Sequence, residues 1–575
     1  MAAAGLRLLG AVWLLVALLL RLGATAAAEA GQATVAAVDG RRAIAATGED
    51  FVCATLDWWP PDKCDYGTCA WGRAGLLNLD LSNKVLLNAV RAFSPLKLRL
   101  GGSLQDKVLY GTADLRRPCM PFVKNESEMF GFTHGCLPLR RWDELNAFFQ
   151  KSGAKIVFGL NAMNGRVPLP DGSMGGPWDY TNAASLIQYT AYKGYHIHGW
   201  ELGNELSGTG VGTRIGAGQY AADVITLKTI GDDIYQSNPS KPLVLAPGGF
   251  FDPSWFKELI VKTKPNLLNV ITHHIYNLGP GRDTNLIEKI LNPSVLDGMI
   301  STFSNLQGIL KSTGTSTVAW VGEAGGAYNS GRHLVTDAFV FSFWFLDQLG
   351  MSAKYDTKSY CRQSLIGGNY GLLNTTTFQP NPDYYSALLW HRLMGTKVLA
   401  TTFNGTNKIR AYAHCARDSP GITLLLINLS GNTKTEVSVT AQAAPAAGAH
   451  KHGARTGYTT AQVSVTNQAA AAAAAGEHKH GGRRHGRKFG HAHAPAPGFA
   501  AAADGATRDE YHLTPKGGDL RSQVMLLNGR ALATGADGSI PRLEAVKVDA
   551  AQPIAVAPHS IVFARISHFH APACS

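Results

Sequence analysis

Two glutamates, Glu205 and Glu323, each follow an apolar segment that contains a tryptophan, and small residues flank both. A lone glutamate in such a position is more often an exposed loop residue or a helix cap. A pair supplies what cleavage of a glycosidic bond requires, because one carboxylic acid protonates the leaving oxygen while a carboxylate acts on the opposite face of the sugar. The pair therefore predicts acid–base chemistry on a glycosidic bond.

Glu201 is an alternative candidate for the acid. It lies four residues before Glu205 within an extended segment, so both side chains point to the same face of that segment. Glu201 would nevertheless lie deeper in the fold. We therefore predict that it forms a supporting ion pair.

The elements that must position these carboxylates alternate between strands and helices. Apolar runs of strand length, each ending in Gly, Pro or polar residues, occupy 96–100, 155–160, 196–202, 243–246, 269–272 and 317–321. Helix-like segments such as 142–151 and 182–193 lie between them. This alternation predicts parallel strands with crossover helices.

A (β/α)8 TIM barrel over residues 51–385 fits this pattern best, because the polar residues stand at the carboxyl ends of several strands, where such barrels place their catalytic loops. The alternative is a doubly wound sheet. That fold is disfavoured because no GxGxxG phosphate signature follows a strand.

Residues 386–575 read as strands only and predict an appended β-sandwich. The expected strands are 397–403, 409–414, 422–429, 436–440, 523–527 and 561–566. The N-terminal stretch 29–50 contains a segment, 32–44, that we expect to add a strand to this sandwich.

A segment rich in Ala, His and Arg, at about 441–507, interrupts the predicted sandwich. Between residues 441 and 500 it carries seven basic residues against one acidic residue, which is half of the net charge of +12. Its composition cannot bury enough apolar surface, so we predict a disordered insertion. The alternative is a metal-binding or polyanion-binding role for its His and Arg clusters. The chain as a whole, 45% hydrophobic and 16% charged over 575 residues, is not that of a disordered or multi-span membrane protein.

The N-terminus has the order of a cleavable secretory signal. Arg7 precedes an apolar run at 8–20, and small residues continue to residue 28. We predict a signal peptide at 1–28 and a secreted protein of the extracellular space or cell wall. An uncleaved anchor is the lesser alternative, and delivery to a lysosome or vacuole, with at most peripheral membrane attachment, is another.

Cysteines and glycosylation sequons agree with secretion. The eight cysteines are an even number, which suggests disulfides of unassigned connectivity in an oxidising compartment. Paired CxxC motifs, the signature of a zinc site, are absent from the sequence, so we predict no metal. Asn-x-Ser/Thr sequons permit N-glycosylation at Asn125, Asn374, Asn404 and Asn428.

Several motifs together resemble the heparanase-like proteins of glycoside hydrolase family 79, especially those of plants. The matching segments are 54–61, 98–106, 200–205, 272–276, 322–328 and 367–370. The resemblance spans about residues 51–385 and implies a retaining glycosidase on a TIM barrel. In the animal members glycines follow the position of Tyr328, whereas Asn329 and Ser330 follow it here.

The resemblance also implies roles for individual residues. Glu205 matches the proton donor and Glu323 the nucleophile. Asn204 matches the residue that binds the sugar 2-hydroxyl. The remaining matches line the sugar subsite: Asp57, His274, Tyr276, Tyr328 and Tyr370. Packing inside the barrel is the alternative role for the aromatic members of this set.

The family acts on β-linked glucuronic acid, so the resemblance implies a glucuronic-acid-containing glycan or proteoglycan of the cell surface or wall as substrate. Tyr370 and the backbone amides after Tyr328 would then bind the sugar carboxylate. We expect no cofactor and no nucleic-acid partner. Two alternatives stay open at this point: a non-catalytic polyanion-binding protein, and a related barrel glycosidase for neutral sugars.

Overall fold

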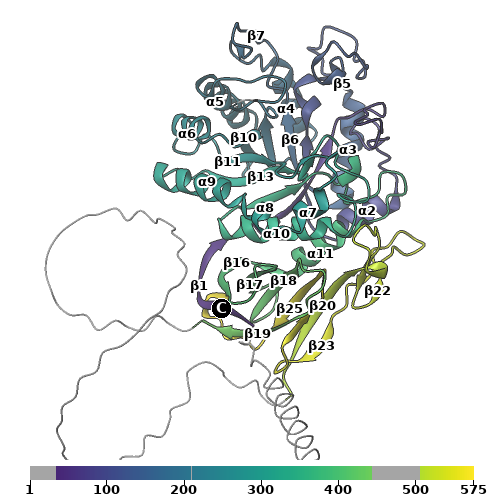
Figure 1. Cartoon of the computed structure of the whole chain (residues 1–575). Coiled ribbons are helices and arrows are strands. Elements are labelled where there is room, and N and C mark those ends of the chain that lie inside the picture. Colours follow the sequence, from purple (N-terminus) through teal and green to yellow (C-terminus); the bar gives the residue numbers. More distant parts are fainter. Residues whose placement is uncertain (1–33, 209, 443–504) are drawn as a thin grey trace, which may run out of the picture.

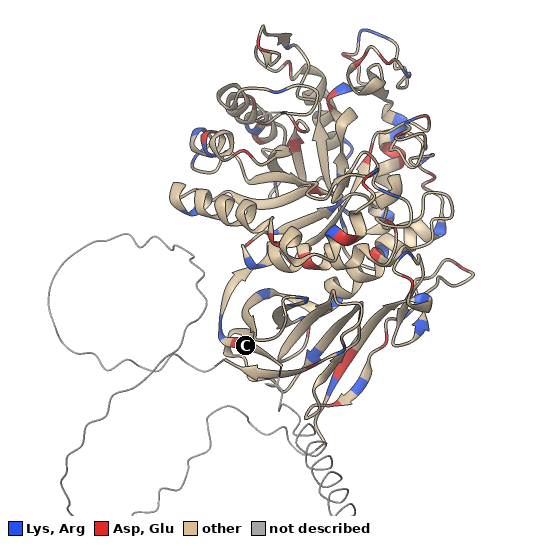
Figure 2. Ribbon diagram, viewed as in Figure 1, with Lys and Arg blue, Asp and Glu red and all other residues tan. Residues whose placement is uncertain are grey.

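A computed structural model of the chain describes residues 34–208, 210–442 and 505–575. It shows a barrel packed on a C-terminal sheet, with helices α10 (Phe341–Lys354) and α11 (Pro382–Leu393) at the junction (Figure 1). The predicted signal peptide and nearly all of the predicted insertion lie outside the described residues. Among those residues, no helix is long and apolar enough to cross a lipid bilayer. Figure 2 shows basic and acidic residues interspersed over both parts of the molecule.

Eight parallel strands close into a barrel, which confirms the predicted fold class. In order around the barrel they are β2 (Val52–Asp57), β3 (Lys97–Gly101), β6 (Lys155–Leu160), β9 (Gly199–Leu202), β10 (Leu243–Phe250), β11 (Val270–Ile275), β13 (Val318–Ala324) and β15 (Ser359–Arg362). A helix follows each strand, as crossover connections require. In chain order these helices are α2 (Lys84–Arg91), α3 (Leu139–Ser152), α4 (Thr181–Tyr192), α5 (Ala217–Ile234), α6 (Pro253–Lys262), α9 (Ile300–Thr313), α10 and α11.

Short strands and short helices lie in the loops of the barrel. Three strand pairs are β4 (Val108–Tyr110) with β5 (Gly135–Leu137), β7 (Val167–Pro168) with β8 (Met174–Gly175), and β12 (Gly279–Pro280) with β14 (Ala327–Tyr328). Helices α7 (Leu286–Ile290) and α8 (Pro293–Asp297) precede α9. Because α11 runs directly into the first strand after it, the barrel ends at Leu393 rather than at residue 385.

The C-terminal part is one continuous sheet of eleven strands rather than two separate sheets. Its strands are β1 (Val35–Ala46), β16 (Met394–Phe403), β17 (Ile409–Ala416), β18 (Ile422–Asn428), β19 (Thr435–Ala441), β20 (Thr507–Pro515), β21 (Met525–Leu527), β22 (Arg530–Ala531), β23 (Val546–Asp549), β24 (Ile554–Val556) and β25 (Ser560–Ile566). The N-terminal strand β1 is antiparallel to β16 and parallel to β19. Segment 32–44 thus overlaps a strand of this sheet.

The sheet curls over itself and encloses a second core. On β18, Leu425 and Ile427 face the barrel, whereas Leu424 and Leu426 pack against Val437 of β19 and residues of β24. Both faces of β18 are therefore buried, which explains why it reads as an unbroken apolar run. The result is sandwich-like packing within a single sheet.

Hydrogen bonds and ion pairs join the C-terminal sheet to the barrel helices. Arg410 Nε and Tyr412 Oη both donate to Oδ1 of Asp347 on α10, at 2.7 and 2.6 Å, and the Asp347 side chain is fully buried. Arg410 also bonds Asp297 of α8 at 2.6 Å. A charge buried and paired in this way fixes the geometry of the contact.

The eight cysteines form four disulfides. Cys53–Cys361 joins the neighbouring barrel strands β2 and β15, and Cys415–Cys574 ties β17 to the C-terminus. Cys119–Cys136 and Cys64–Cys69 close loops on the barrel. The prediction that the cysteines form disulfides is confirmed, and the structure supplies their connectivity.

Candidate active site

The two glutamates meet at the carboxyl ends of the barrel strands. Glu205 follows β9, Glu323 lies near the end of β13, and His274 lies on β11 between them in the sheet order. One ligand atom of each of these three buried residues lies within 4.8 Å of the other two. Retaining glycosidases hold their carboxyl groups about 5–5.5 Å apart, whereas inverting enzymes need about 6.5–9.5 Å. One oxygen of Glu205 and one of Glu323 lie within 4.8 Å of each other, which fits the shorter, retaining separation.

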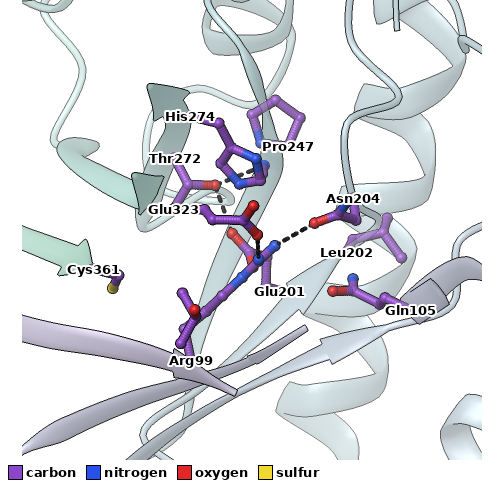
Figure 3. A network of polar contacts seen from close by, with 12 residues as sticks. Arg99, Gln105, Glu201, Leu202, Asn204, Pro247, Thr272, His274, Glu323 and Cys361 are labelled. Atoms are coloured by element: carbon purple, nitrogen blue, oxygen red, sulfur yellow. Dashed lines mark hydrogen bonds and ion pairs between the residues drawn. The ribbon is translucent and has the colours of Figure 1, made fainter. Parts of the chain in front are cut away.

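Arg99 of β3 is the hub of this network (Figure 3). Its guanidinium group is buried and donates to Glu201 Oε2 at 2.6 Å, to Glu323 Oε2 at 2.7 Å and to Asn204 Oδ1 at 2.8 Å. The second oxygen of Glu201 accepts from Thr272 Oγ1 at 2.7 Å. Glu201 is therefore held in an ion pair below the pocket, and both of its oxygens are occupied.

Both oxygens of Glu323 accept hydrogen bonds from fixed donors. Tyr276 Oη lies 2.5 Å from Oε1, and Arg99 reaches Oε2. Burial, together with the charge of Glu323, raises the pKa of Tyr276 well above its ordinary value, so the phenol remains a donor. These contacts orient the carboxylate and offset its negative charge, as a nucleophile requires.

Glu205 has a different environment. It is buried, and its Oε1 lies 3.0 Å from Nδ1 of His274. Burial raises the pKa of Glu205 to about 7, and the charge of Arg99 only partly opposes this shift. Burial lowers the pKa of His274 to about 4, so the imidazole is neutral and does not pull the proton from Glu205. Glu205 can therefore hold a proton near neutral pH.

The backbone at Glu205 is strained. Its φ angle is 55°, in the left-handed region that long side chains rarely adopt. Glu205 N donates to Gly248 O at 2.7 Å, and the preceding amide, Asn204 N, donates to Asp106 Oδ2 at 2.8 Å. Burial raises the pKa of Asp106 to about 7. These contacts stabilise the strained turn that orients Glu205 toward the pocket.

Asp57 stands at the end of β2 and faces the same space. Its Oδ2 accepts from Gln363 Nε2 at 2.5 Å, whereas its Oδ1 has no hydrogen-bond partner among the described residues. Burial, and then the charge of Glu323, raise the pKa of Asp57 well above its usual range. A Cβ atom at Gly102 would lie 1.6 Å from Oδ1, so only glycine fits there. A buried, half-satisfied carboxyl of this kind fits a sugar hydroxyl.

These residues line a pocket of about 390 Å³. Of the predicted site residues, six contribute to its wall: Asp57, Glu205, Tyr276, Glu323, Tyr328 and Tyr370. Asn204 and His274 are not part of the wall and lie behind it, in contact with Arg99 and Glu205. Tyr328 is 43% exposed at the mouth, and Tyr370 is buried.

The loop after Tyr328 has an unusual backbone. Asn329, Ser330 and Gly331 have φ angles of 56°, 65° and 67°, all left-handed. Their amides donate no hydrogen bond to any part of the chain that the structure describes. Consecutive free amides in a turn form an anion-binding concavity. This loop can therefore receive a carboxylate.

Glu205, His274 and Glu323 are also a donor set that a cation could occupy. The guanidinium of Arg99, 2.7 Å from Glu323, would repel a cation at that position. The arrangement fits a sugar flanked by two carboxyl groups better than a metal ion.

Comparison with known proteins supports this interpretation. Residues 33–350 match the family model described as glycosyl hydrolase family 79, N-terminal domain. The chain is 53% identical over 538 residues to heparanase-like protein 3 of Arabidopsis thaliana, covering 94% of each chain. It is 42% identical to baicalin-beta-D-glucuronidase of Scutellaria baicalensis, covering 91% of this chain and 90% of the relative.

The chain belongs to glycosyl hydrolase family 79. It is therefore a glycoside hydrolase. Among solved structures, a 4-O-alpha-L-rhamnosyl-beta-D-glucuronidase from Fusarium oxysporum superposes with a TM-score of 0.59 at 14% identity, over 93% of this chain and 100% of the other. At that identity the likeness shows a shared fold.

Several residues of this family 79 site were not assigned from the sequence. Arg99 and Gln363 donate to the predicted carboxyl groups Glu323 and Asp57, and Asp106 accepts from the backbone amide of Asn204. For Arg99 there was a signal, because a charged residue inside an apolar strand needs a buried partner, and Glu201 had been predicted to form an ion pair. Gln363 gives no such signal.

The predicted glycosylation sites differ in exposure. Asn125 and Asn404 are exposed, and Asn374 is half-buried. Asn428 is fully buried, and its Nδ2 donates to Thr433 O and to two carbonyl groups of the 556–557 segment. A glycan on Asn428 is incompatible with these contacts, so the prediction for this sequon is wrong for the folded chain.

Proposed function

We propose that the protein is a retaining β-glucuronidase that hydrolyses β-linked glucuronic acid. The observation that carries this proposal is that one oxygen of Glu205 lies within 4.8 Å of one oxygen of Glu323, with a raised pKa on Glu205 and fixed donors to Glu323. Two similar proteins bear the names heparanase-like protein and baicalin-beta-D-glucuronidase, which supports a glucuronide as the substrate.

In the first step, Glu323 attacks the anomeric carbon while Glu205 donates its proton to the glycosidic oxygen. The C–O bond to the leaving group breaks, and a covalent glycosyl ester forms on Glu323. Arg99 and Tyr276 hold the attacking carboxylate in line. Proximity of both groups to one bound sugar removes the entropic cost of assembling them.

In the second step, the ionised Glu205 takes a proton from a water molecule, and the hydroxide attacks the anomeric carbon from the face that the leaving group left. The ester bond to Glu323 breaks and its carboxylate is restored. Two inversions give net retention. No cofactor is needed for either step.

The left-handed loop 329–331 and Tyr370 support recognition of the C6 carboxylate. The loop offers free amides, and burial raises the pKa of Tyr370 well above its ordinary value, which keeps its hydroxyl a donor. We propose glucuronosylated glycans of the cell surface or cell wall as the natural substrates.

We propose further that the protein is secreted after cleavage of a signal peptide at residues 1–28. Pairing of all eight cysteines supports this, because disulfides persist in oxidising compartments. We also propose that glycans are attached at the exposed sequons Asn125 and Asn404 and at the half-buried Asn374. Mass spectrometry of the protein from culture medium tests both points, through its N-terminal residue and its glycopeptides.

A chromogenic β-glucuronide at mildly acidic pH tests the activity. The purified protein should release the chromophore, and proton NMR should show the β-anomer of glucuronic acid as the first product. Glu323→Gln should be inactive. First formation of the α-anomer would contradict the retaining mechanism, and faster turnover of the matching β-glucoside would favour a neutral-sugar glycosidase.

A further inference from the structure

A short loop closed by the Cys64–Cys69 disulfide lies on the rim of the catalytic pocket. It follows β2 and carries Asp65, and Lys63 directly precedes its first cysteine; both side chains line the pocket together with Glu205 and Glu323. Because the disulfide spans only five positions of sequence, the loop can rearrange little. It therefore presents these two side chains to the pocket in a defined position.

Lys63 is held by two contacts. Its Nζ lies 3.0 Å from Asp65 Oδ1 and 4.4 Å from the centroid of the Trp59 ring. The side chain is 20% exposed, so it is neither buried in the core nor free in solvent. An ammonium group over an aromatic face is partly desolvated and directed.

Carboxyl groups outnumber cationic side chains in the described wall of the pocket. Its described lining contains four carboxyl groups, on Asp57, Asp65, Glu205 and Glu323, and Lys63 is the one Lys or Arg side chain among those residues. An acidic sugar would bring a further negative charge into this space. Removing that charge from water without a cationic partner is costly.

The loop is also coupled to the proposed carboxylate-binding loop. Asp65 Oδ2 accepts a 2.5 Å hydrogen bond from Ser330 Oγ, and Ser330 Oγ in turn accepts from Trp71 Nε1 at 2.9 Å. Asn329 Nδ2 donates to Tyr66 Oη at 3.1 Å. Lys63 is therefore tied through Asp65 to the segment 329–331, whose amides donate no hydrogen bond within the described residues.

We propose that Lys63 is the residue that selects acidic over neutral sugars, by placing its ammonium group against the carboxylate of the bound substrate. This inference rests on the proposed β-glucuronidase activity and specifies how the same pocket recognises charge. The segment 329–331 then gives the carboxylate its geometry, whereas Lys63 supplies the opposing charge. A charge-assisted hydrogen bond of this kind outweighs a neutral one.

The test compares one variant on two substrates that differ only at C6. Lys63→Met keeps the length of the side chain and removes its charge. On p-nitrophenyl β-glucuronide we expect kcat/KM to fall about 10- to 100-fold, mostly through KM, as loss of a charged hydrogen bond predicts. On p-nitrophenyl β-glucoside kcat/KM should stay within about twofold, since that substrate has no carboxylate to pair with Lys63.

Matched variants separate this role from others. Lys257→Met removes an exposed lysine from α6 and should change neither substrate. Lys63→Arg should recover most of the selectivity. If Lys63 only neutralised Asp65, the double variant Lys63→Met with Asp65→Asn would regain the preference for the glucuronide. We expect it to remain as unselective as Lys63→Met.

The outcomes are distinct. Wild-type turnover of the glucuronide with an unchanged preference in Lys63→Met would overturn the inference alone, as would restored selectivity in the double variant. Wild-type turnover of neither substrate would overturn the proposed function and this inference with it. Equal losses on both substrates would assign Lys63 to the support of the loop.

Discussion

The two ends of the barrel interior bury charge in opposite ways, although strand β3 supplies the central cation to both. At the lower end, where strand β3 begins, Lys97 Nζ donates to Asp50 Oδ1 and to Ser359 Oγ, each at 3.0 Å. It also lies 3.9 Å from the centroid of the Trp320 ring. At the upper end, which holds the catalytic pocket, Arg99 lies two residues further along β3 and donates to the carboxyl groups of Glu201 and Glu323.

At the lower end each charge is compensated. Burial would raise the pKa of Asp50, but Lys97 and Lys155 together outweigh burial and lower it well below its usual range. Burial lowers the pKa of Lys97 to about 8, and Asp50 limits that fall. The paired charges of Asp50 and Lys97 stabilise this end of the fold.

At the upper end Arg99 cannot satisfy every carboxyl group. Glu201 and Glu323 bond to it directly, whereas Glu205 and Asp57 do not and have raised pKa values. Burial raises the pKa of Glu205, and no cation among the described residues bonds that carboxyl group directly to offset the shift, so Glu205 can act as the proton donor. The same strand thus serves stability at one end and chemistry at the other.

Replacement of Glu323 should produce the largest effect. Glu323→Gln removes the nucleophile but keeps a side chain that accepts from Tyr276, so turnover of a β-glucuronide should fall at least about a thousandfold. The melting temperature should fall as well, because Arg99 loses one of its two buried carboxylate partners. Residual activity above a tenth of wild type would show that another group is the nucleophile.

Replacement of Glu205 should have an effect that depends on the leaving group. Glu205→Gln should slow alkyl glucuronides by about 10²- to 10⁴-fold, the usual contribution of a general acid. An activated aryl leaving group needs little protonation and should be slowed less in its departure. Wild-type activity should decline above pH 7, where Glu205 loses its proton, and this limb should be absent in the variant. Equal losses for both leaving groups would contradict the assignment.

Lys97→Met tests the lower end. Breaking a buried ion pair by removing one partner costs about 3–5 kcal/mol, so the free energy of unfolding should fall by about that amount in urea titrations. The values of kcat and KM for the folded enzyme should not change, since Lys97 contacts only groups at the lower end. A loss of kcat without a loss of stability would show that the two ends are coupled.

Much of this arrangement could be predicted from sequence. Strand and helix periodicity indicated the barrel, and the ends of β9 and β13 indicated Glu205 and Glu323, because an apolar run that stops at a polar residue is a local signal. Arg99 and Gln363 could not be assigned, since Arg99 lies 224 positions from Glu323 and Gln363 lies 306 positions from Asp57, and these pairs become neighbours only when the barrel closes. Nor could the single curled sheet be distinguished from a sandwich, because both bury alternate residues of the same strands.

The smallest expected effect is on stability at the upper end, and it has the opposite sign to that of Lys97→Met. The pKa of Glu205 rises from 4.5 to about 7 on folding, so its contribution to stability is fully present below pH 4.5 and is lost as the pH rises through 7. Glu205→Gln removes this penalty and keeps a side chain that can bond His274. We expect the variant to be more stable than wild type by at most about 3 kcal/mol at pH 8, the equivalent of that pKa shift, and unchanged at pH 4. Urea titrations at both pH values measure the difference. Destabilisation at pH 8 would show that the carboxylate is compensated after all, and that the two ends of the barrel bury charge by the same rule.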